Sequence, residues 1–80
     1  MTPPIIVLTG SPPWQEEAAR LLDGLGYQLV CYGEREGYVP RLAEDHAALV
    51  LVDGDAAGWE FWVTTPKASS ATRRIPVVVV

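Results

Sequence analysis

The chain has 80 residues, enough for a single domain, and its hydrophobic share of 49% is typical of a globular protein. Ten acidic residues against six Lys and Arg give a net charge of -4 with no basic stripe, which argues against direct binding of nucleic acid or an anionic membrane surface. No stretch approaches the ~20 apolar residues of a membrane-spanning helix, and no signal-peptide pattern is visible, so we expect a cytoplasmic location.

The first two predicted elements are a short strand and an amphipathic helix. Ile5–Leu8 is an apolar, mostly β-branched run, which is typical of a strand buried on both faces. Ser11 is a favourable N-cap for a helix that begins with Pro12 and Pro13, because prolines are tolerated in the first turn. Gly26 stands where a left-handed C-terminal cap is expected. The apolar residues between them recur at helical spacing and form one stripe: Ala18, Leu21, Leu22 and Leu25.

The middle of the chain predicts a second strand and a short second helix. Tyr27–Tyr32 is the strand, and its Cys31 is interpreted as a small buried hydrophobe, since a lone cysteine cannot form an internal disulfide. Tyr38–His46 is the helix, with Pro40 in its first turn. The only histidine, His46, would interact with the helix dipole, and without a second histidine or an activated nucleophile hydrolase chemistry has no visible basis. The buried side of this helix would consist of Val39, Leu42 and Ala43.

The second half of the chain repeats the alternation of strand and helix. Ala48–Val52 is predicted to be a buried strand that ends at Asp53. A third helix begins at Trp59 and is expected to reach only about Val63, because Thr64-Thr65-Pro66 interrupts it. After a polar stretch, Val77–Val80 is an unbroken apolar run that predicts a last buried strand.

This regular alternation predicts the fold class. Strands that alternate with helices favour an α/β fold with a parallel sheet and right-handed crossovers. The chain contains no internal repeat, linker or low-complexity segment, so residues 1–80 are interpreted as one domain.

Three features give the chain a resemblance to the receiver domain of two-component response regulators. The third strand ends in Asp53, the segment Gly58-Trp59-Glu60 is similar to the family's Asp-Gly-x-Glu helix start, and Ala71–Val79 is similar to the approach to the family's fourth strand. The resemblance implies a doubly wound parallel sheet of flavodoxin-like topology with strand order 2-1-3-4-5. It covers four of those five strands, so we expect the domain to be incomplete at its C-terminus.

The resemblance also implies a chemistry, namely phosphoryl transfer to Asp53 assisted by a divalent metal ion such as Mg²⁺. The family carries an acidic pair after its first strand, but Thr9 and Gly10 stand there in this chain. The loop after Asp53 is shorter than the family's and lacks its proline, while the hydroxyl residue ending strand four and the lysine ending strand five would lie beyond Val80. Asp55 is a candidate substitute metal ligand, because it lies two residues after Asp53 in a glycine-flanked loop.

We therefore interpret the chain as a degenerate receiver-like signalling domain that is not an enzyme and acts through protein–protein interaction. No cofactor is expected, and Mg²⁺ would be needed only if Asp53 is phosphorylated. Two alternatives stay open: a phospho-accepting receiver that uses Asp53, and a small phosphate- or nucleotide-binding domain that uses the Thr9–Ser11 loop. If Asp53 is not an acceptor, it would cap nearby amides or bond to Thr9 or Ser11.

Two apolar features are candidate interaction surfaces. Trp59 and Trp62 share a helical face and either pack in the core or form an exposed patch for a protein partner. Val77 and Val79 belong to a terminal strand that would form an open edge of the sheet, which invites pairing with another chain. The expected partner is therefore a signalling protein or a second copy of this chain.

Overall fold

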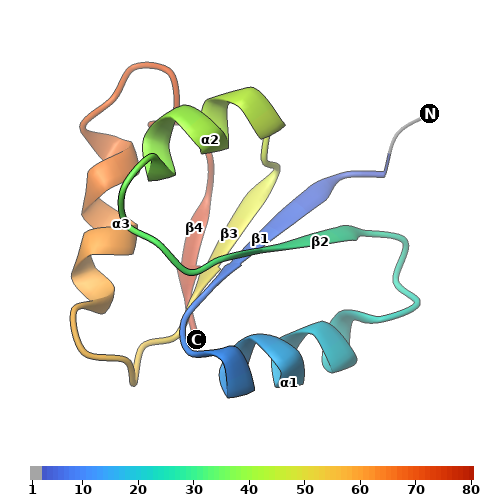
Figure 1. Cartoon of the computed structure of the whole chain (residues 1–80). Coiled ribbons are helices and arrows are strands. Elements are labelled where there is room, and N and C mark those ends of the chain that lie inside the picture. The colour runs from blue at the N-terminus through green and yellow to red at the C-terminus, as the bar shows by residue number, and fades with distance from the viewer. Residues whose placement is uncertain (1–2) are drawn as a thin grey trace.

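The computed structural model describes residues 3–80. Four parallel strands form one sheet in the order β2-β1-β3-β4. Figure 1 shows α1 on one face of this sheet and α2 and α3 on the other. The fold is therefore a doubly wound α/β fold of flavodoxin-like topology, as the sequence predicts. The elements are β1 (Ile5–Thr9), α1 (Pro12–Leu22), β2 (Gln28–Tyr32), α2 (Tyr38–Asp45), β3 (Leu49–Val52), α3 (Trp59–Lys67) and β4 (Val77–Val79).

The main hydrophobic core lies between the sheet and the pair α2 and α3. Alternate residues of the central strands enter it, because successive side chains of a strand point to opposite faces. The rings of Tyr38 and Trp62 meet edge to face in this core, with their centroids 4.7 Å apart. The buried members of the core are Val7, Tyr32, Tyr38, Leu42, Ala47, Val50, Val52 and Trp62.

The opposite face of the sheet is covered less completely. No residue of α1 is buried, and Leu21 is 72% exposed, so the apolar stripe of this helix is only partly packed. The helix also ends earlier than the sequence suggests, since Asp23 caps it and Gly24 then takes a left-handed conformation with φ +81°. Leu25 consequently lies beyond the helix and is exposed.

Cys31 is exposed, which contradicts its prediction as a buried hydrophobe. It lies on β2, the strand at one edge of the sheet. Its side chain points to the face opposite the core residue Tyr32, where the partly packed α1 leaves it accessible. The apolar pattern of its strand did not show that this strand is an edge.

The prediction for α2 is partly confirmed. Leu42 is buried, whereas Val39 and Ala43 are half-buried, and Tyr38 at the start of the helix is the second buried residue. The helix ends at Asp45, and the exposed His46 follows it in a left-handed conformation with φ 51°. The predicted place of the histidine at a helix end is correct.

The predicted end of α3 is wrong, because the helix continues through Pro66 to Lys67. Proline has no N–H, so it cannot donate to the carbonyl of Trp62, four residues earlier. The hydroxyl of Tyr38 donates to that carbonyl instead, at 2.9 Å in the buried core. The hydroxyl of Thr72 then donates to the carbonyl of Pro66 at 2.8 Å and holds the following turn against the helix end. A tertiary contact thus replaces the hydrogen bond that proline removes.

No helix in the described part of the chain, residues 3–80, has the length and apolar character needed to cross a membrane.

Candidate functional site

The candidate site lies at the carboxyl ends of β1 and β3, which are neighbours in the sheet. Their register pairs Thr9 with Val52, so the loops that follow the two strands meet at one edge. The chain winds outward from β1 to β2 and then returns past β1 to β3, which makes this the switch point of the doubly wound sheet. Ligands of open α/β sheets usually bind in the crevice at such a point.

Asp53 occupies the predicted position at the end of β3 and is 9% exposed. Its backbone N–H donates to the carbonyl of Thr9 at 3.3 Å, which ties the loop to β1. Its carboxylate oxygen Oδ1 accepts a hydrogen bond of 3.0 Å from the backbone N–H of Asp55. Its carbonyl accepts from the N–H of Ala56 at 3.2 Å. Asp53 therefore organises its own loop, in agreement with the alternative that it caps nearby amides.

The two hydroxyl residues of the neighbouring loop make other hydrogen bonds. Thr9 is fully buried and its Oγ1 donates to the carbonyl of Leu51 at 3.1 Å. The Oγ of Ser11 accepts from the backbone N–H of Trp14 at 3.4 Å, which confirms Ser11 as the N-cap of α1. Neither hydroxyl bonds to Asp53, so the predicted hydrogen bond from Asp53 to Thr9 or Ser11 is not observed.

Trp14 is the site residue that sequence reasoning missed. A Cβ placed on Gly10 would lie 2.8 Å from Cε3 of Trp14 and 2.9 Å from Cβ of Asp53. The indole and the aspartate thus flank the same glycine, whose φ of +142° is itself unfavourable for other residues. The place of Trp14 in the first turn of α1, three residues after the N-cap, was the available signal, because that turn stands directly over the loop.

A second missed residue, Gln15, connects the ends of two strands. Its Nε2 donates to the carbonyl of Leu8 on β1 and to the carbonyl of Tyr32 on β2, each at 3.1 Å. One amide group therefore satisfies both carbonyls and holds the start of α1 against the carboxyl edge of the sheet. A glutamine in the first turn of a helix gives no clear signal for such a bridge.

The donor set around Asp53 does not fit a Mg²⁺ ion of the kind that the receiver resemblance implies. A magnesium site draws on several oxygen ligands in octahedral geometry. Here the Thr9 hydroxyl is directed to Leu51, Gly10 has no side chain, and the indole of Trp14 packs against it. Among residues 3–80, no group of three or more His, Cys, Asp and Glu residues is placed to hold a metal. Asp55 is exposed, and its backbone N–H donates to the Asp53 carboxylate.

The end of β4 completes this edge of the sheet. The N–H of Gly54 donates to the carbonyl of Val80 at 3.1 Å. A Cβ on Gly54 would lie 2.7 Å from Cγ1 of Val79, so glycine is needed for this close approach. Val77 is half-buried against the core, whereas Val79 is exposed.

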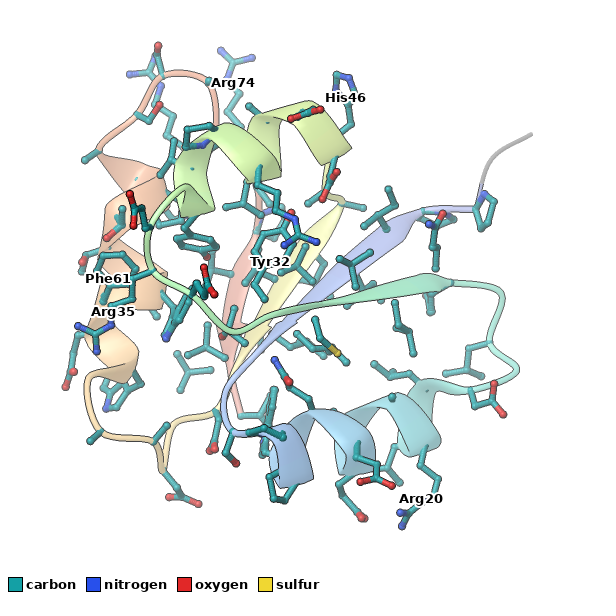
Figure 2. The ribbon with its side chains drawn as sticks, viewed as in Figure 1. Arg20, Tyr32, Arg35, His46, Phe61 and Arg74 are labelled. Atoms are coloured by element: carbon teal, nitrogen blue, oxygen red, sulfur yellow. The ribbon has the colours of Figure 1, made fainter. Side chains whose placement is uncertain are left out.

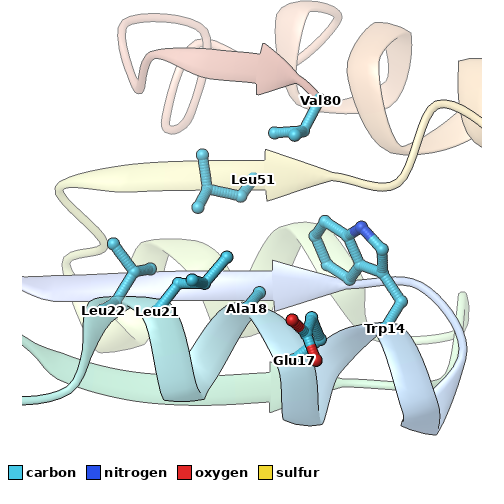
Figure 3. A pocket seen from close by; sticks show the side chains of 7 residues that line it. All are labelled: Trp14, Glu17, Ala18, Leu21, Leu22, Leu51 and Val80. Atoms are coloured by element: carbon cyan, nitrogen blue, oxygen red, sulfur yellow. The ribbon is translucent and has the colours of Figure 1, made fainter.

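A shallow apolar hollow opens beside Trp14, between α1 and the sheet (Figure 3). Its volume is about 170 Å³, and Glu17 supplies its only charged side chain. The lining residues come from α1, β3 and the end of β4: Trp14, Glu17, Ala18, Leu21, Leu22, Leu51 and Val80. Leu21 and Val80 are the exposed large hydrophobic residues of this lining.

The aromatic residues of α3 divide between core and surface. Trp62 is buried, so it packs in the core as one of the two sequence-based interpretations expected. Trp59 is half-buried and packs against the same core. Phe61 carries the guanidinium of Arg35 above its ring at 5.0 Å, a cation–π contact visible in Figure 2. The same guanidinium lies directly against Gly58, the N-cap of α3. These tryptophans therefore form no continuous exposed patch.

No family model matches the chain, and no curated protein matches it.

Proposed function

We propose that this chain is a receiver-like signalling domain that acts through contacts with proteins and not through phosphorylation of Asp53. The observation that carries the proposal is the packing of Trp14 against Gly10 and beside Asp53. In the family that the chain resembles, acidic side chains follow the first strand and help to hold the metal. An acidic side chain at position 10 would collide with the indole and with Asp53 itself.

The hydrogen bonds of Asp53 support a structural role for this residue. A phospho-acceptor must present a carboxylate oxygen to the phosphorus atom, with cationic groups to balance the developing charge. Here one carboxylate oxygen is already engaged by the Asp55 amide, and Arg35, the cation at the start of α3, is stacked on Phe61. Asp53 can hold the loop between β3 and α3 in place without any chemistry.

The test is a titration with Mg²⁺ and beryllofluoride, followed by tryptophan fluorescence. Trp14 serves as the reporter because it flanks the same glycine as Asp53. We expect no saturable change in the folded protein or in Asp53→Asn, a variant that retains an oxygen acceptor for the Asp55 amide. A saturable change that Asp53→Asn abolishes would overturn the proposal and favour a phospho-accepting receiver.

The remaining alternative, phosphate or nucleotide binding at the Thr9–Ser11 loop, predicts a different result. Pro12 and Pro13 occupy the first two positions of α1, so two of the amides that would cradle an anion are missing. We expect no thermal stabilisation by inorganic phosphate or by nucleoside triphosphates. If either compound stabilises the protein and Trp14→Ala changes that stabilisation, the result would favour this alternative.

A further inference from the structure

The strand β2 forms the edge of the sheet opposite β4 (Figure 1). The backbone N–H of Gln28 donates to the carbonyl of Pro4 at 2.9 Å, so Gln28 turns its backbone groups toward β1. Because these groups alternate along a strand, those of Leu29 and Cys31 point away from the sheet. Within residues 3–80 no strand pairs with this side of β2. The further strand that the receiver resemblance implies would pair with β4, so it would leave the β2 edge as it is.

This edge lacks most of the features that usually prevent strand pairing. Proteins protect edge strands with charged residues, prolines, bulges or a covering element. The strand Gln28–Tyr32 contains no charged residue and no proline, and its consecutive residues pair with β1 without a bulge. Cys31 is exposed and Leu29 is half-buried, on the face where α1 has no buried residue. An extended segment can therefore reach the free backbone groups of β2 and continue the sheet.

Acidic side chains without ion pairs stand at both ends of the edge. Asp23 lies in the turn before β2, and Glu34 and Glu36 lie in the loop after it. All three residues are exposed, and none of them forms an ion pair within residues 3–80. Both ends of the β2 edge are therefore negative.

The arginines of the elements around β2 do not neutralise these acids, because they make other contacts. Arg20 on α1 and Arg41 on α2 each pair with a carboxylate of their own helix, at 3.0 and 3.7 Å. Arg35, in the loop after β2, is stacked on Phe61 of α3. The remaining cations belong to the segment between α3 and β4, at the opposite edge of the sheet: Lys67, Arg73 and Arg74.

This distribution of charge selects between two kinds of neighbour. In an antiparallel pair of β2 strands from two copies of this chain, Asp23 of each copy would lie at the end where the other copy carries Glu34 and Glu36. Acidic ends would also meet in a parallel pair. An incoming segment with cations at both ends would instead complement the charge of the edge. The observations therefore favour a basic segment of another protein over a second copy.

We propose that the β2 edge binds an extended segment of a partner protein that has apolar residues in its middle and lysine or arginine at both ends. The segment pairs with Leu29 and Cys31 through backbone hydrogen bonds and adds a strand to the sheet. Its cations lie beside Asp23 at one end and beside Glu34 and Glu36 at the other. The proposal rests on the proposed function, because it names the surface and the partner chemistry of the same protein-binding domain.

The probe is a short capped peptide in which threonine and valine alternate between two lysines at each end. We expect a dissociation constant between ~10 µM and ~1 mM at low salt, measured by fluorescence anisotropy, because a short edge buries less surface than a standard interface. Absence of binding in this range would overturn the proposal. Two control peptides should not bind: one with glutamates in place of the lysines, and one with N-methylated amides in the middle, which keeps the charge but removes backbone donors. Equal binding of either control would also overturn it.

Amide hydrogen exchange tests the place of binding. In the free chain the outward amides of Leu29 and Cys31 should exchange fast, whereas the amides of Val30 and Tyr32, which face β1, should exchange slowly. We expect the lysine peptide to slow exchange at Leu29 and Cys31 by at least ~tenfold and to leave the other two amides nearly unchanged. Unchanged exchange at both outward amides in the presence of bound peptide would place the peptide elsewhere and contradict the proposal.

Cys31→Pro removes an outward N–H without removing a hydrogen bond to β1, so it should block the edge. We expect it to weaken binding of the lysine peptide by at least ~tenfold, whereas Cys31→Ser, which keeps the amide, should bind as the unchanged chain does. Circular dichroism checks that both variants are folded. Equal binding by folded Cys31→Pro and Cys31→Ser would refute the pairing.

A charge variant keeps the test independent of proline. Glu34→Lys should weaken binding of the lysine peptide several-fold at low salt, and the effect should fade as salt is added. Glu60→Lys makes the same change of charge on an exposed residue of α3 and should have little effect. Equal effects of the two variants would contradict the assignment of the acidic ends.

Sedimentation equilibrium of the chain alone tests the other occupant. We expect no self-association that depends on β2. A dimer that Cys31→Pro abolishes and Cys31→Ser keeps would show that a second copy occupies the edge, and would overturn the proposal.

Failure of this inference can be told apart from failure of the proposed function. If the lysine peptide does not bind and the chain shows no response to Mg²⁺ and beryllofluoride, only the β2 proposal is lost. If the peptide protects Leu29 and Cys31 but the chain also gives a phosphorylation response that Asp53→Asn abolishes, the proposed function is lost and the β2 site remains.

Discussion

The hydroxyl of Tyr38 stabilises a helix to which it does not belong, and Tyr38→Phe measures that effect. The hydroxyl donates to the carbonyl of Trp62, which has lost its helical donor to Pro66. Phenylalanine keeps the ring that packs edge to face on Trp62 and removes only the oxygen. Because the carbonyl then stays buried without a partner, we expect a loss of about 1–3 kcal/mol in the free energy of unfolding.

The same reasoning predicts that the destabilisation caused by Tyr38→Phe depends on residue 66. In Pro66→Ala the alanine N–H can donate to the Trp62 carbonyl, so the Tyr38 hydroxyl is no longer the sole donor. We expect Tyr38→Phe to cost less than about 1 kcal/mol in that background, which gives a measurable coupling between the two sites. Helix propensity alone would change the stability of Pro66→Ala but would create no coupling with Tyr38.

The assay is urea unfolding of the four proteins of this cycle, followed by far-ultraviolet circular dichroism. For a chain of this size, a loss of 1 kcal/mol corresponds to about 4–8 °C in melting temperature, so thermal melts provide a second measurement. Tyr27→Phe is the matched control, because Tyr27 is exposed and should change stability by no more than about 0.5 kcal/mol. Equal costs of Tyr38→Phe with proline and with alanine at position 66 would refute the reasoning.

Three further predictions concern the site and the core. Gly10→Ala should destabilise the fold by about 1–3 kcal/mol in urea unfolding and shift the tryptophan emission maximum, because the methyl group meets the indole at 2.8 Å and φ is +142°. Burial raises the pKa of Tyr38 above its usual 10.0. Since the unfolded state then ionises first, the contribution of Tyr38 to stability should be constant below pH ~10 and be lost above it. Stability above pH ~10 should therefore fall less steeply in Tyr38→Phe, and an equal slope in both proteins would count against this assignment. Gln15→Ala should cost about 1–3 kcal/mol, because two strand-end carbonyls lose their shared donor, whereas Glu16→Ala on the exposed side of the helix should be nearly neutral.

The strands and their parallel arrangement were predictable from the sequence. The β-branched runs at Ile5–Leu8 and Val77–Val80, with helix signals between them, indicate buried strands joined by crossovers. Asp53 could also be placed at the end of a strand, because a charged residue closes an apolar run there. These features depend on residues that are neighbours in the chain, so local pattern is sufficient to find them.

The detail of the candidate site depended on the tertiary structure. The contact of Trp14 with Gly10 beside Asp53 requires the angle at which α1 leaves the sheet, and the two carbonyls bound by Gln15 belong to different strands. The exposure of Cys31 likewise depends on how incompletely α1 packs on its face of the sheet. No spacing rule along one chain contains these distances.

The end of α3 shows most clearly what the local sequence determines and what the tertiary structure decides. The local sequence pattern predicts that the helix ends at the Thr64-Thr65-Pro66 segment, because proline removes a hydrogen bond and restricts the residue before it. The folded chain supplies the Tyr38 hydroxyl, from 24 residues away, to the carbonyl that proline leaves without a donor. The sequence by itself determined the alternation of strands and helices, because that depends on local periodicity. Only the tertiary structure decided where α3 ends and what surrounds Asp53, because those outcomes depend on partners brought together by the fold.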